Sequence, residues 1–214
     1  MVKIKFIKQE SEHVFFTSDT HFYHKNILHY CNRPFKDIQE MNQTLIDNWN
    51  SVVEEDDYVF HLGDFCFAGS DKWKELTSQL NGHIVLIKGN HDHMSKTMEK
   101  LFDHVSYEMS IEVDKTRVYL NHYPFLTYAG PYKKAPVIQL FGHVHTSKRT
   151  TGKDRGRIKM LFPTQYDVGV DNNNFTPVSW KQISKRVTEQ CKKRNSLKNR
   201  IINWIINRMW TWMN

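Results

Sequence analysis

Side chains that can bind metal ions occur in five short groups along this chain of 214 residues. In chain order, the groups are Asp19-x-His21, Gly63-Asp64, Gly89-Asn90-His91-Asp92, His122 and Gly142-His143-x-His145. Carboxylates neutralise divalent cations, imidazoles suit borderline metals, and an Asn carbonyl adds a neutral ligand. Two such ions can hold the attacking and the leaving oxygens of an in-line displacement at phosphorus. The ordered series therefore predicts a two-metal phosphoester hydrolase.

Each group directly follows a short apolar run that is rich in strand-forming residues. The runs are residues 13–18, 58–62, 84–88, 118–121 and 137–141. Their length and composition predict buried strands. In open α/β sheets, ligands bind beyond the carboxyl ends of the strands. We therefore expect all five groups to converge on one cleft.

Helical patterns separate the first of these strands. Residues 37–49 carry apolar side chains at helical spacing, and Asp37 with Glu40 fits a capping box at their start. Residues 71–80 predict a second helix that stops before an Asn-Gly pair. Residues 108–121 predict a hairpin around a central Asp-Lys pair. The alternation of strands and helices predicts βαβ units.

The order of the ligand groups resembles the D-x-H, G-D, G-N-H-[DE], H and G-H-x-H pattern of the calcineurin-like metallophosphoesterase superfamily, over about residues 13–180. Within that range, the stretches around Asp19, Arg33 and Asp64 are similar to a small bacterial and phage branch of predicted phosphoesterases. Tyr23 departs from the Gly that this branch usually has there. The resemblance implies an α/β (α+β) fold in which a two-sheet β-sandwich is flanked by helices.

The resemblance also implies two divalent ions, with manganese expected and iron, zinc, nickel or magnesium as alternatives. It makes Asp64 the ligand that both ions share. The other implied ligands form two sets, one of Asp19, His21 and His145 and one of Asn90, His122 and His143. His91 is then a catalytic residue that faces the phosphoryl group, and Asp92 orients its imidazole. The ions supply hydroxide from the water held between them.

Several residues near the motifs are candidates for contact with the substrate. They are His24, Asn26, Arg33 and His61, with Phe65, Phe67, Tyr123 and Tyr128 as candidate walls of an aromatic pocket.

The motifs predict hydrolysis of a phosphomonoester or phosphodiester, nucleotides and oligonucleotide ends included, without naming the molecule. A protein phosphatase is a disfavoured alternative, because Gly63-Asp64 lacks the D-R-G sequence that follows in that group. A non-enzymatic module that binds nucleic acid or membranes through the C-terminal tail is the other alternative.

Length and composition predict one catalytic domain at residues 1–180, located in the cytoplasm. Three cysteines, Cys31, Cys66 and Cys191, lie far apart without C-x-x-C spacing, which indicates reduced thiols. Residues 1–8 alternate apolar and polar side chains, which indicates an edge strand or a leader and does not indicate secretion.

The remaining residues, 181–214, predict a basic, Trp-rich helical extension. The whole chain has a net charge of +7, and this segment contains nine Lys or Arg residues and one acidic residue. Its apolar side chains on one helical face are Ile201, Ile202, Ile205, Met209, Trp212 and Met213. Interspersed Asn and Arg residues argue against a transmembrane span. Three roles stay open: docking on its own or a second subunit as a homo-oligomer, peripheral attachment to an anionic membrane, and binding of nucleic acid.

Residues 179–191, with a Ser-x-x-Gln capping box, are predicted to pack on the body.

Overall fold

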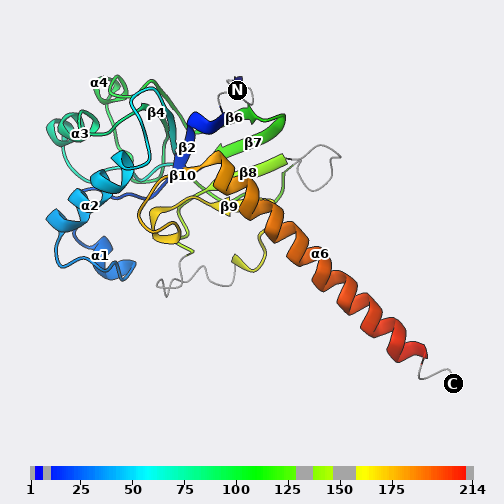
Figure 1. Cartoon of the computed structure of the whole chain (residues 1–214). Helices are drawn as coiled ribbons and strands as arrows, with labels where there is room; N and C mark the ends of the chain where they lie inside the picture. Colours follow the sequence, from blue (N-terminus) through cyan, green and yellow to red (C-terminus); the bar gives the residue numbers. More distant parts are fainter. Residues whose placement is uncertain (1–2, 7–10, 129–136, 147–157, 211–214) are drawn as a thin grey trace.

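Two five-stranded sheets form the centre of the molecule (Figure 1). The structure, a computed structural model, describes residues 3–6, 11–128, 137–146 and 158–210. The first sheet has the order β1-β6-β7-β8-β9. Its strands are β1 (Lys3–Phe6), β6 (Glu108–Val113), β7 (Thr116–Asn121), β8 (Val137–Phe141) and β9 (Gln165–Asp167). Only the β6–β7 pair in this sheet is antiparallel.

The second sheet has the order β10-β2-β3-β4-β5 and is parallel apart from the β10–β2 pair. Its strands are β2 (Val14–Thr17), β3 (Tyr58–His61), β4 (His83–Ile87), β5 (His104–Ser106) and β10 (Val178–Ser179). Parallel strands that are covered on both faces read as continuous apolar runs, which is the pattern of β2, β3 and β4.

Alternate side chains of the second sheet enter two separate cores. Val14, Phe16 and Phe60 pack against the first sheet, and the rings of Phe16 and Phe60 stack with centroids 5.4 Å apart. Phe15 and Val59 point the opposite way and pack against the helices. One face of the second sheet therefore closes the sandwich, and the other face carries the helical layer. The two-sheet fold flanked by helices was predicted and is confirmed.

Four helices lie beside the second sheet: α1 (Ile27–Tyr30), α2 (Ile38–Asn50), α3 (Ser70–Thr77) and α4 (Lys96–Glu99). The predicted cap of α2 is present, because the Asp37 carboxylate accepts from the backbone N–H of Glu40 at 2.9 Å. Helix α3 ends three residues before the predicted end. The hydroxyls of Thr77 and Ser78 donate to carbonyls of the preceding turn, and such bonds compete with helix continuation. The short helices α1 and α4 were not predicted.

The five predicted strands that precede the ligand groups are all present as β2, β3, β4, β7 and β8. The predicted hairpin joins β6 and β7, and its turn residues Asp114 and Lys115 have φ values of 47° and 62°. A two-residue hairpin turn with positive φ at both positions matches the right-handed twist of its strands. The predicted edge strand is β1, which pairs only with β6 among the described strands.

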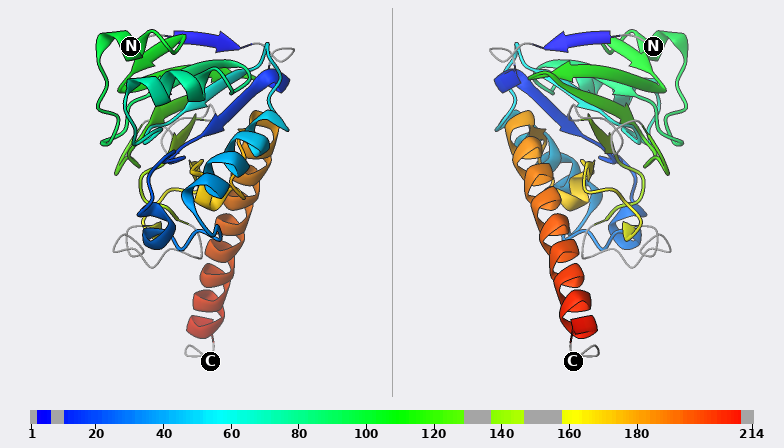
Figure 2. Two further views of the ribbon diagram at one scale, coloured as in Figure 1. Left: turned by 90° about the vertical axis from the view of Figure 1, so that its left-hand side faces the viewer. Right: turned by 90° about the vertical axis from the view of Figure 1, so that its right-hand side faces the viewer.

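Helix α6 (Trp180–Trp210) begins on the body and then extends beyond it (Figure 2). Trp180, Ile183 and Val187 are buried in the core between the sheets, as predicted. The predicted capping box is also present, since the N–H of Gln182 donates to the Ser179 hydroxyl and the Gln182 side chain accepts from the N–H of Ser179. The expected apolar face of residues 201–213 lies outside the described side chains. Among the described helices, α6 included, none combines the length and the apolar character needed to cross a membrane.

Candidate metal centre

The ligand groups meet because the loops that carry them are hydrogen-bonded to one another. The N–H of Asp19, after β2, donates to the carbonyl of Gly63, after β3, at 2.9 Å. The N–H of Gly142, after β8, donates to the carbonyl of His122, after β7, at 2.9 Å. The N–H of His143 donates to the Asp19 carboxylate at 3.0 Å and so joins the two sheets. The N–H of His91, after β4, donates to the Asp64 carboxylate at 3.0 Å, so all five groups lie at one edge of the sandwich.

Two separate clusters of potential ligand atoms lie at this edge, and a third group, of Cys31, His145 and Asp171, overlaps the first through His145. Asp19, His21 and His145 form one cluster, and the potential ligand atoms of its members lie within 4.8 Å of one another. A second cluster, defined in the same way, contains Asp64, His122 and His143. The Oδ2 atom of Asp64 lies 3.6 Å from Nε2 of His21 and 3.5 Å from Nε2 of His122. One carboxylate oxygen thus faces both clusters.

Asn90 lies beside the second cluster. Its Oδ1 atom is 3.0 Å from Nε2 of His122 and 3.4 Å from the hydroxyl of Tyr123. Asn90 is an exposed residue. The arrangement places the neutral oxygen where a cation beside His122 and Asp64 would meet it.

A buried nitrogen without a hydrogen-bond partner tests whether these residues suit metal ions. His21 is 3% exposed, and its Nε2 atom has no hydrogen-bond partner among the described residues. Burial, with His145 nearby, holds the pKa of His21 well below its ordinary value, so the imidazole is neutral. A buried polar atom without a partner is costly in a folded protein. A cation beside Asp64 would satisfy this nitrogen, and the donor set therefore fits divalent metal.

The backbone is strained at five of the seven predicted metal ligands. These residues have φ between 43° and 70°, in the left-handed region: Asp19, His21, Asp64, His143 and His145. Non-glycine residues seldom adopt this conformation, and such strain concentrates at functional sites. Hydrogen bonds between the loops hold these five non-glycine residues in the left-handed conformation.

Two glycines allow the loops to approach each other. A Cβ atom on Gly89 would collide with the Asp64 carboxylate, and a Cβ atom on Gly142 would collide with Ser18 and with the Asp19 carboxylate. Both glycines adjoin predicted ligands in the sequence. Because they have no side chain, these glycines leave room for the carboxylates of Asp64 and Asp19.

Hydrogen bonds fix the ring orientation of two of the histidines. Nδ1 of His122 donates to the carbonyl of Leu62 at 2.7 Å, and Nδ1 of His145 donates to Oδ2 of Asp171 at 2.7 Å. Both Nε2 atoms are left facing the clusters, as in many metal sites. Burial would lower the pKa of His122, but the carboxylate of Asp64, with that of Asp19, outweighs burial and raises it to about 9.

Asp171 was not singled out in the sequence, although it connects the first cluster to a buried arginine. Its carboxylate also accepts from Nε and Nη2 of Arg33 at 2.9 and 2.8 Å. Burial raises the pKa of Asp171, but Arg33 and His145 outweigh burial and hold it below its ordinary value. The signal available in the sequence was an Asp directly after the short apolar run at residues 168–170, although in the structure that run lies beyond β9 and Asp171 stands in a 3-10 turn.

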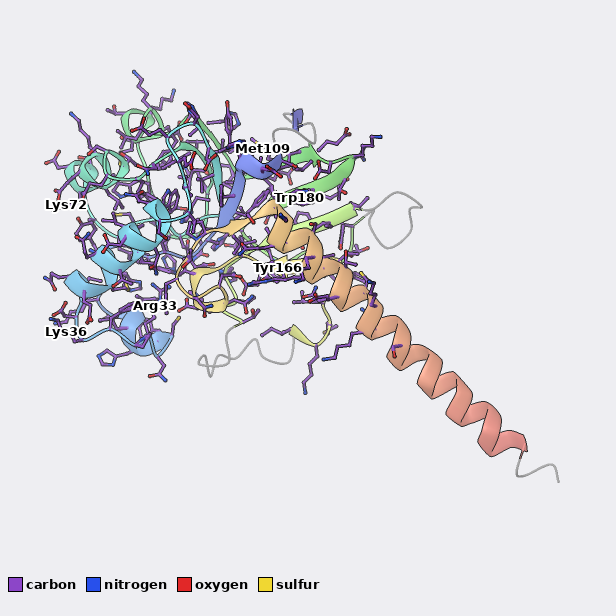
Figure 3. All side chains as sticks on the ribbon, viewed as in Figure 1. Arg33, Lys36, Lys72, Met109, Tyr166 and Trp180 are labelled. Atoms are coloured by element: carbon purple, nitrogen blue, oxygen red, sulfur yellow. The ribbon has the colours of Figure 1, made fainter. Side chains whose placement is uncertain are left out.

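Arg33 itself is buried, and it lies in the region between α1 and α2 (Figure 3). Its remaining N–H groups donate to the carbonyls of Asp19 and Thr20 and to the sulfur of Met41. All five N–H groups of its guanidinium therefore have protein acceptors. These contacts favour a positioning role for Arg33 over the predicted contact with a substrate phosphate.

His61 is also fully buried rather than facing a cleft. Its Nε2 atom bonds the Thr20 hydroxyl at 2.9 Å, and its Nδ1 atom accepts from the N–H of Gly63 at 3.2 Å. Burial lowers the pKa of His61 to about 3. The ring is therefore a neutral link between the loops after β2 and β3, and its predicted substrate contact lacks a path to solvent in this structure.

His24 and Asn26 are the predicted substrate residues that reach the surface. His24 is half-buried, with its Nδ1 atom 3.2 Å from Nδ1 of His21 and its ring stacked on Phe67 with centroids 3.9 Å apart. Asn26 is exposed at the start of α1, where its side chain makes no capping bond. Phe65, another predicted pocket wall, is instead buried in the helical core.

Asp92 makes contacts that differ from the predicted ones. Its buried carboxylate accepts from the backbone N–H groups of Asp64, Phe65 and Gly89 at 2.8, 2.9 and 2.8 Å. These bonds hold the loop after β3 to the loop after β4, in place of the predicted orientation of the His91 ring. His91 is exposed, with its ring centroid 4.8 Å from that of Phe67.

Residues 13–163 match the domain of the calcineurin-like phosphoesterase superfamily. The chain therefore belongs to this superfamily, whose members include metal-dependent phosphoesterases, and the predicted family is confirmed. An uncharacterized protein of Methanocaldococcus jannaschii is 53% identical over 81 residues, which cover 37% of this chain and 46% of that protein. The Gene 66 protein of Mycobacterium phage L5 is 36% identical over 132 residues, which cover 52% of this chain and 63% of that protein. This chain thus spans less than two thirds of either relative.

A solved structure is also similar over most of the chain. It is a protein of unknown function from Aquifex aeolicus, with a TM-score of 0.64 and 27% sequence identity. The match covers 80% of this chain and 97% of that chain. The similarity supports the observed fold.

Proposed function

We propose that this protein hydrolyses a phosphomonoester or phosphodiester with two divalent metal ions bound at the edge of the sandwich. The single observation that carries the proposal is the position of Asp64, whose Oδ2 atom lies 3.6 and 3.5 Å from an imidazole nitrogen of each cluster. A shared carboxylate between two sets of nitrogen and oxygen ligands suits a pair of ions. Manganese is the ion that we expect, and iron, zinc, nickel and magnesium are compatible with the same donors.

The proposed ligands divide as the two clusters do. Asp64 is shared, and the other proposed ligands are Asp19, His21 and His145 for one ion and Asn90, His122 and His143 for the other. When bound, two ions at this site would bind the phosphoryl oxygens and lower the pKa of a water between them. The chain's own contribution is to hold these ligands on strained loops, so that little rearrangement accompanies binding.

His91 is the proposed catalytic residue that is not a ligand. Its backbone N–H donates to Oδ1 of Asp64 at 3.0 Å, so its position depends directly on the shared carboxylate. The exposed ring lies 4.8 Å from that of Phe67 and 5.9 Å from that of the proposed ligand His21, measured between centroids. From there, its imidazole donates a hydrogen bond to the phosphoryl group and a proton to the leaving oxygen. Asp92 supports this position by holding the loop backbone.

The C-terminal part of α6 is proposed as an appendage outside the catalytic machinery. The first turns of α6 are buried against the body, and every proposed metal ligand precedes residue 146. We propose that the extension at residues 181–214 mediates self-association through its part beyond Val187, with attachment to anionic lipid or nucleic acid as the competing roles. Location in the cytoplasm, peripheral membrane association and the domain division at residue 180 stay part of this proposal.

The direct test uses purified protein loaded with Mn²⁺ and two chromogenic substrates, p-nitrophenyl phosphate and bis(p-nitrophenyl) phosphate. We expect metal-dependent release of p-nitrophenol from one of them and about two metal ions per chain by elemental analysis. Asp64→Asn should lower both metal content and rate, whereas Asp47→Asn, on the outer face of α2, should change neither. A metal-loaded, folded protein with no turnover of either substrate or of a wider phosphoester panel would contradict the proposal.

A further inference from the structure

An apolar hollow opens directly beside the second ligand cluster. Its volume is about 540 Å³. The residues that line it are Tyr123, Pro124, Phe125, Leu126, His143, Val144, Ile158, Met160 and Leu161. None of these described lining residues is a Lys, Arg, Asp or Glu. The walls formed by these described residues therefore offer no fixed cation to a second phosphate and suit an uncharged group.

The hollow and the proposed metal centre share a wall. His143 belongs to the second cluster and also lines the hollow. The ring of Tyr123 packs against that of His143, with centroids 4.6 Å apart, and its hydroxyl lies 3.4 Å from Oδ1 of Asn90. A phosphoryl group held at the centre therefore has the hollow as adjoining space for whatever is esterified to it.

Two buried glutamines hold the hollow in shape without a ligand. Gln139 accepts from the N–H of Phe125 at 3.1 Å and donates to the carbonyl of Tyr123 at 2.9 Å. Gln165 donates to the carbonyl of Phe125 at 2.9 Å and accepts from the N–H of Phe162 at 2.8 Å. Both glutamines are at most 3% exposed. They connect the wall at Tyr123 and Phe125 to Phe162, which follows the lining residue Leu161, so buried hydrogen bonds hold these two walls together.

Two large apolar side chains on its rim are left in water. Leu126 is 80% exposed and Met160 is 67% exposed. Adjacent exposed apolar groups commonly mark a binding site. Preformed apolar pockets with a few polar groups at one end are typical of sites for small molecules. In this hollow, the polar end is the wall formed by His143 and Tyr123.

We infer that this hollow binds the apolar ester group of the substrate, of aryl or nucleobase size, while the phosphoryl group lies at the metal centre. The inference rests on the proposed function and narrows its substrate class. Flat, uncharged groups fill such a space and displace water from Leu126 and Met160, whereas a small or charged group does not. Phosphoesters of aryl groups or nucleosides should therefore be preferred over those of short alkyl or acidic groups.

The test compares the binding of two non-hydrolysable probes, phenylphosphonate and methylphosphonate, to the Mn²⁺-loaded full chain by calorimetry. Each probe has a single substituent, so only one group is available for the hollow. We expect phenylphosphonate to bind about tenfold more tightly, which corresponds to about 1.4 kcal/mol. The double variant Leu126→Ser/Met160→Ser should reduce that ratio to about 2, since both side chains lie on the surface and their loss spares the core.

Two matched controls accompany this variant. Leu126→Met keeps an apolar side chain and should retain the ratio, and Tyr107→Ser removes an exposed aromatic group outside the hollow and should also retain it. An affinity ratio of phenylphosphonate to methylphosphonate near 1 in the wild type would overturn the inference, and so would an unchanged ratio in the double variant. The proposed function stands in either case if the protein still turns over p-nitrophenyl esters. Absence of turnover with the ratio present contradicts the proposed function alone. A fall in oligomer mass in the double variant, measured by light scattering, would show that a second copy covers the hollow and would overturn the substrate assignment.

Discussion

Replacing Asp171 by Asn tests whether a residue outside the ligand motifs controls the metal centre. The Asp171 carboxylate accepts from Nδ1 of His145 at 2.7 Å and from two N–H groups of Arg33 at 2.8 and 2.9 Å. An amide has one acceptor oxygen and one donor nitrogen. Whichever way the Asn side chain is turned, its NH₂ group faces an N–H of Arg33 or of His145. The variant therefore loses at least one hydrogen bond and the negative charge.

Two magnitudes follow from the burial of this pair. The side chains of Arg33 and Asp171 are 0% and 3% exposed, so the guanidinium would remain buried without its counter-charge. Removal of one partner of a buried ion pair typically costs about 3–5 kcal/mol of stability. Loss of the residue that orients a metal-binding histidine typically costs about 10–100-fold in metal affinity. We expect Asp171→Asn to show both effects, with the loss of affinity in the His145 site.

The assay measures Mn²⁺ affinity by competition with a chelator, at a temperature where circular dichroism shows the variant folded, and stability by urea unfolding. Asp57→Asn is the matched control, because Asp57 is 3% exposed and accepts from Nδ1 of His13 at 2.6 Å outside the site. The control should lose stability and keep its metal affinity. If folded Asp171→Asn binds both ions as tightly as the wild type, the proposed orientation of His145 through Asp171 is wrong.

Three further outcomes are expected. His91→Ala should keep both ions and lose most of kcat, whereas Asp64→Asn should lose metal as well; equal metal loss in the two variants would make His91 a ligand. Burial lowers the pKa of His61 from 6.5 to about 3, so the unfolded chain binds a proton in that interval that the folded chain excludes. Stability of the metal-free protein should therefore fall as pH decreases from 6.5 towards 3, and His61→Gln should flatten this part of a urea-midpoint profile; an unchanged slope would exclude His61 as a cause. Deletion of residues 195–214 should leave turnover of bis(p-nitrophenyl) phosphate nearly unchanged and alter association in light scattering at low and high salt; a folded, metal-loaded truncation without turnover would place the tail in the active site.

The main elements of the fold were predictable because their signals are local. Apolar runs of strand length mark β2, β3 and β4, and the Asp37 side chain starts α2 through a bond to a residue three positions away. The short elements α1, α4 and β5 were missed because three or four residues carry too little periodicity to distinguish a helix from a strand or a loop. Helix α3 was predicted too long because the apolar spacing continues to Leu80 and the Asn-Gly pair that was expected to stop the helix comes only after it.

The sequence by itself determined the chemistry that is available: which side chains can bind divalent ions, their order, and the strands that carry them. Their residue types define this chemistry, and the chain order is enough to recognise the family. Only the tertiary structure decided which atoms meet. It buried Arg33 and His61, turned Asp92 towards backbone N–H groups, and joined Asp171 to His145. Those contacts connect residues up to 138 positions apart in the chain, and no local pattern encodes them because they depend on how the two sheets pack.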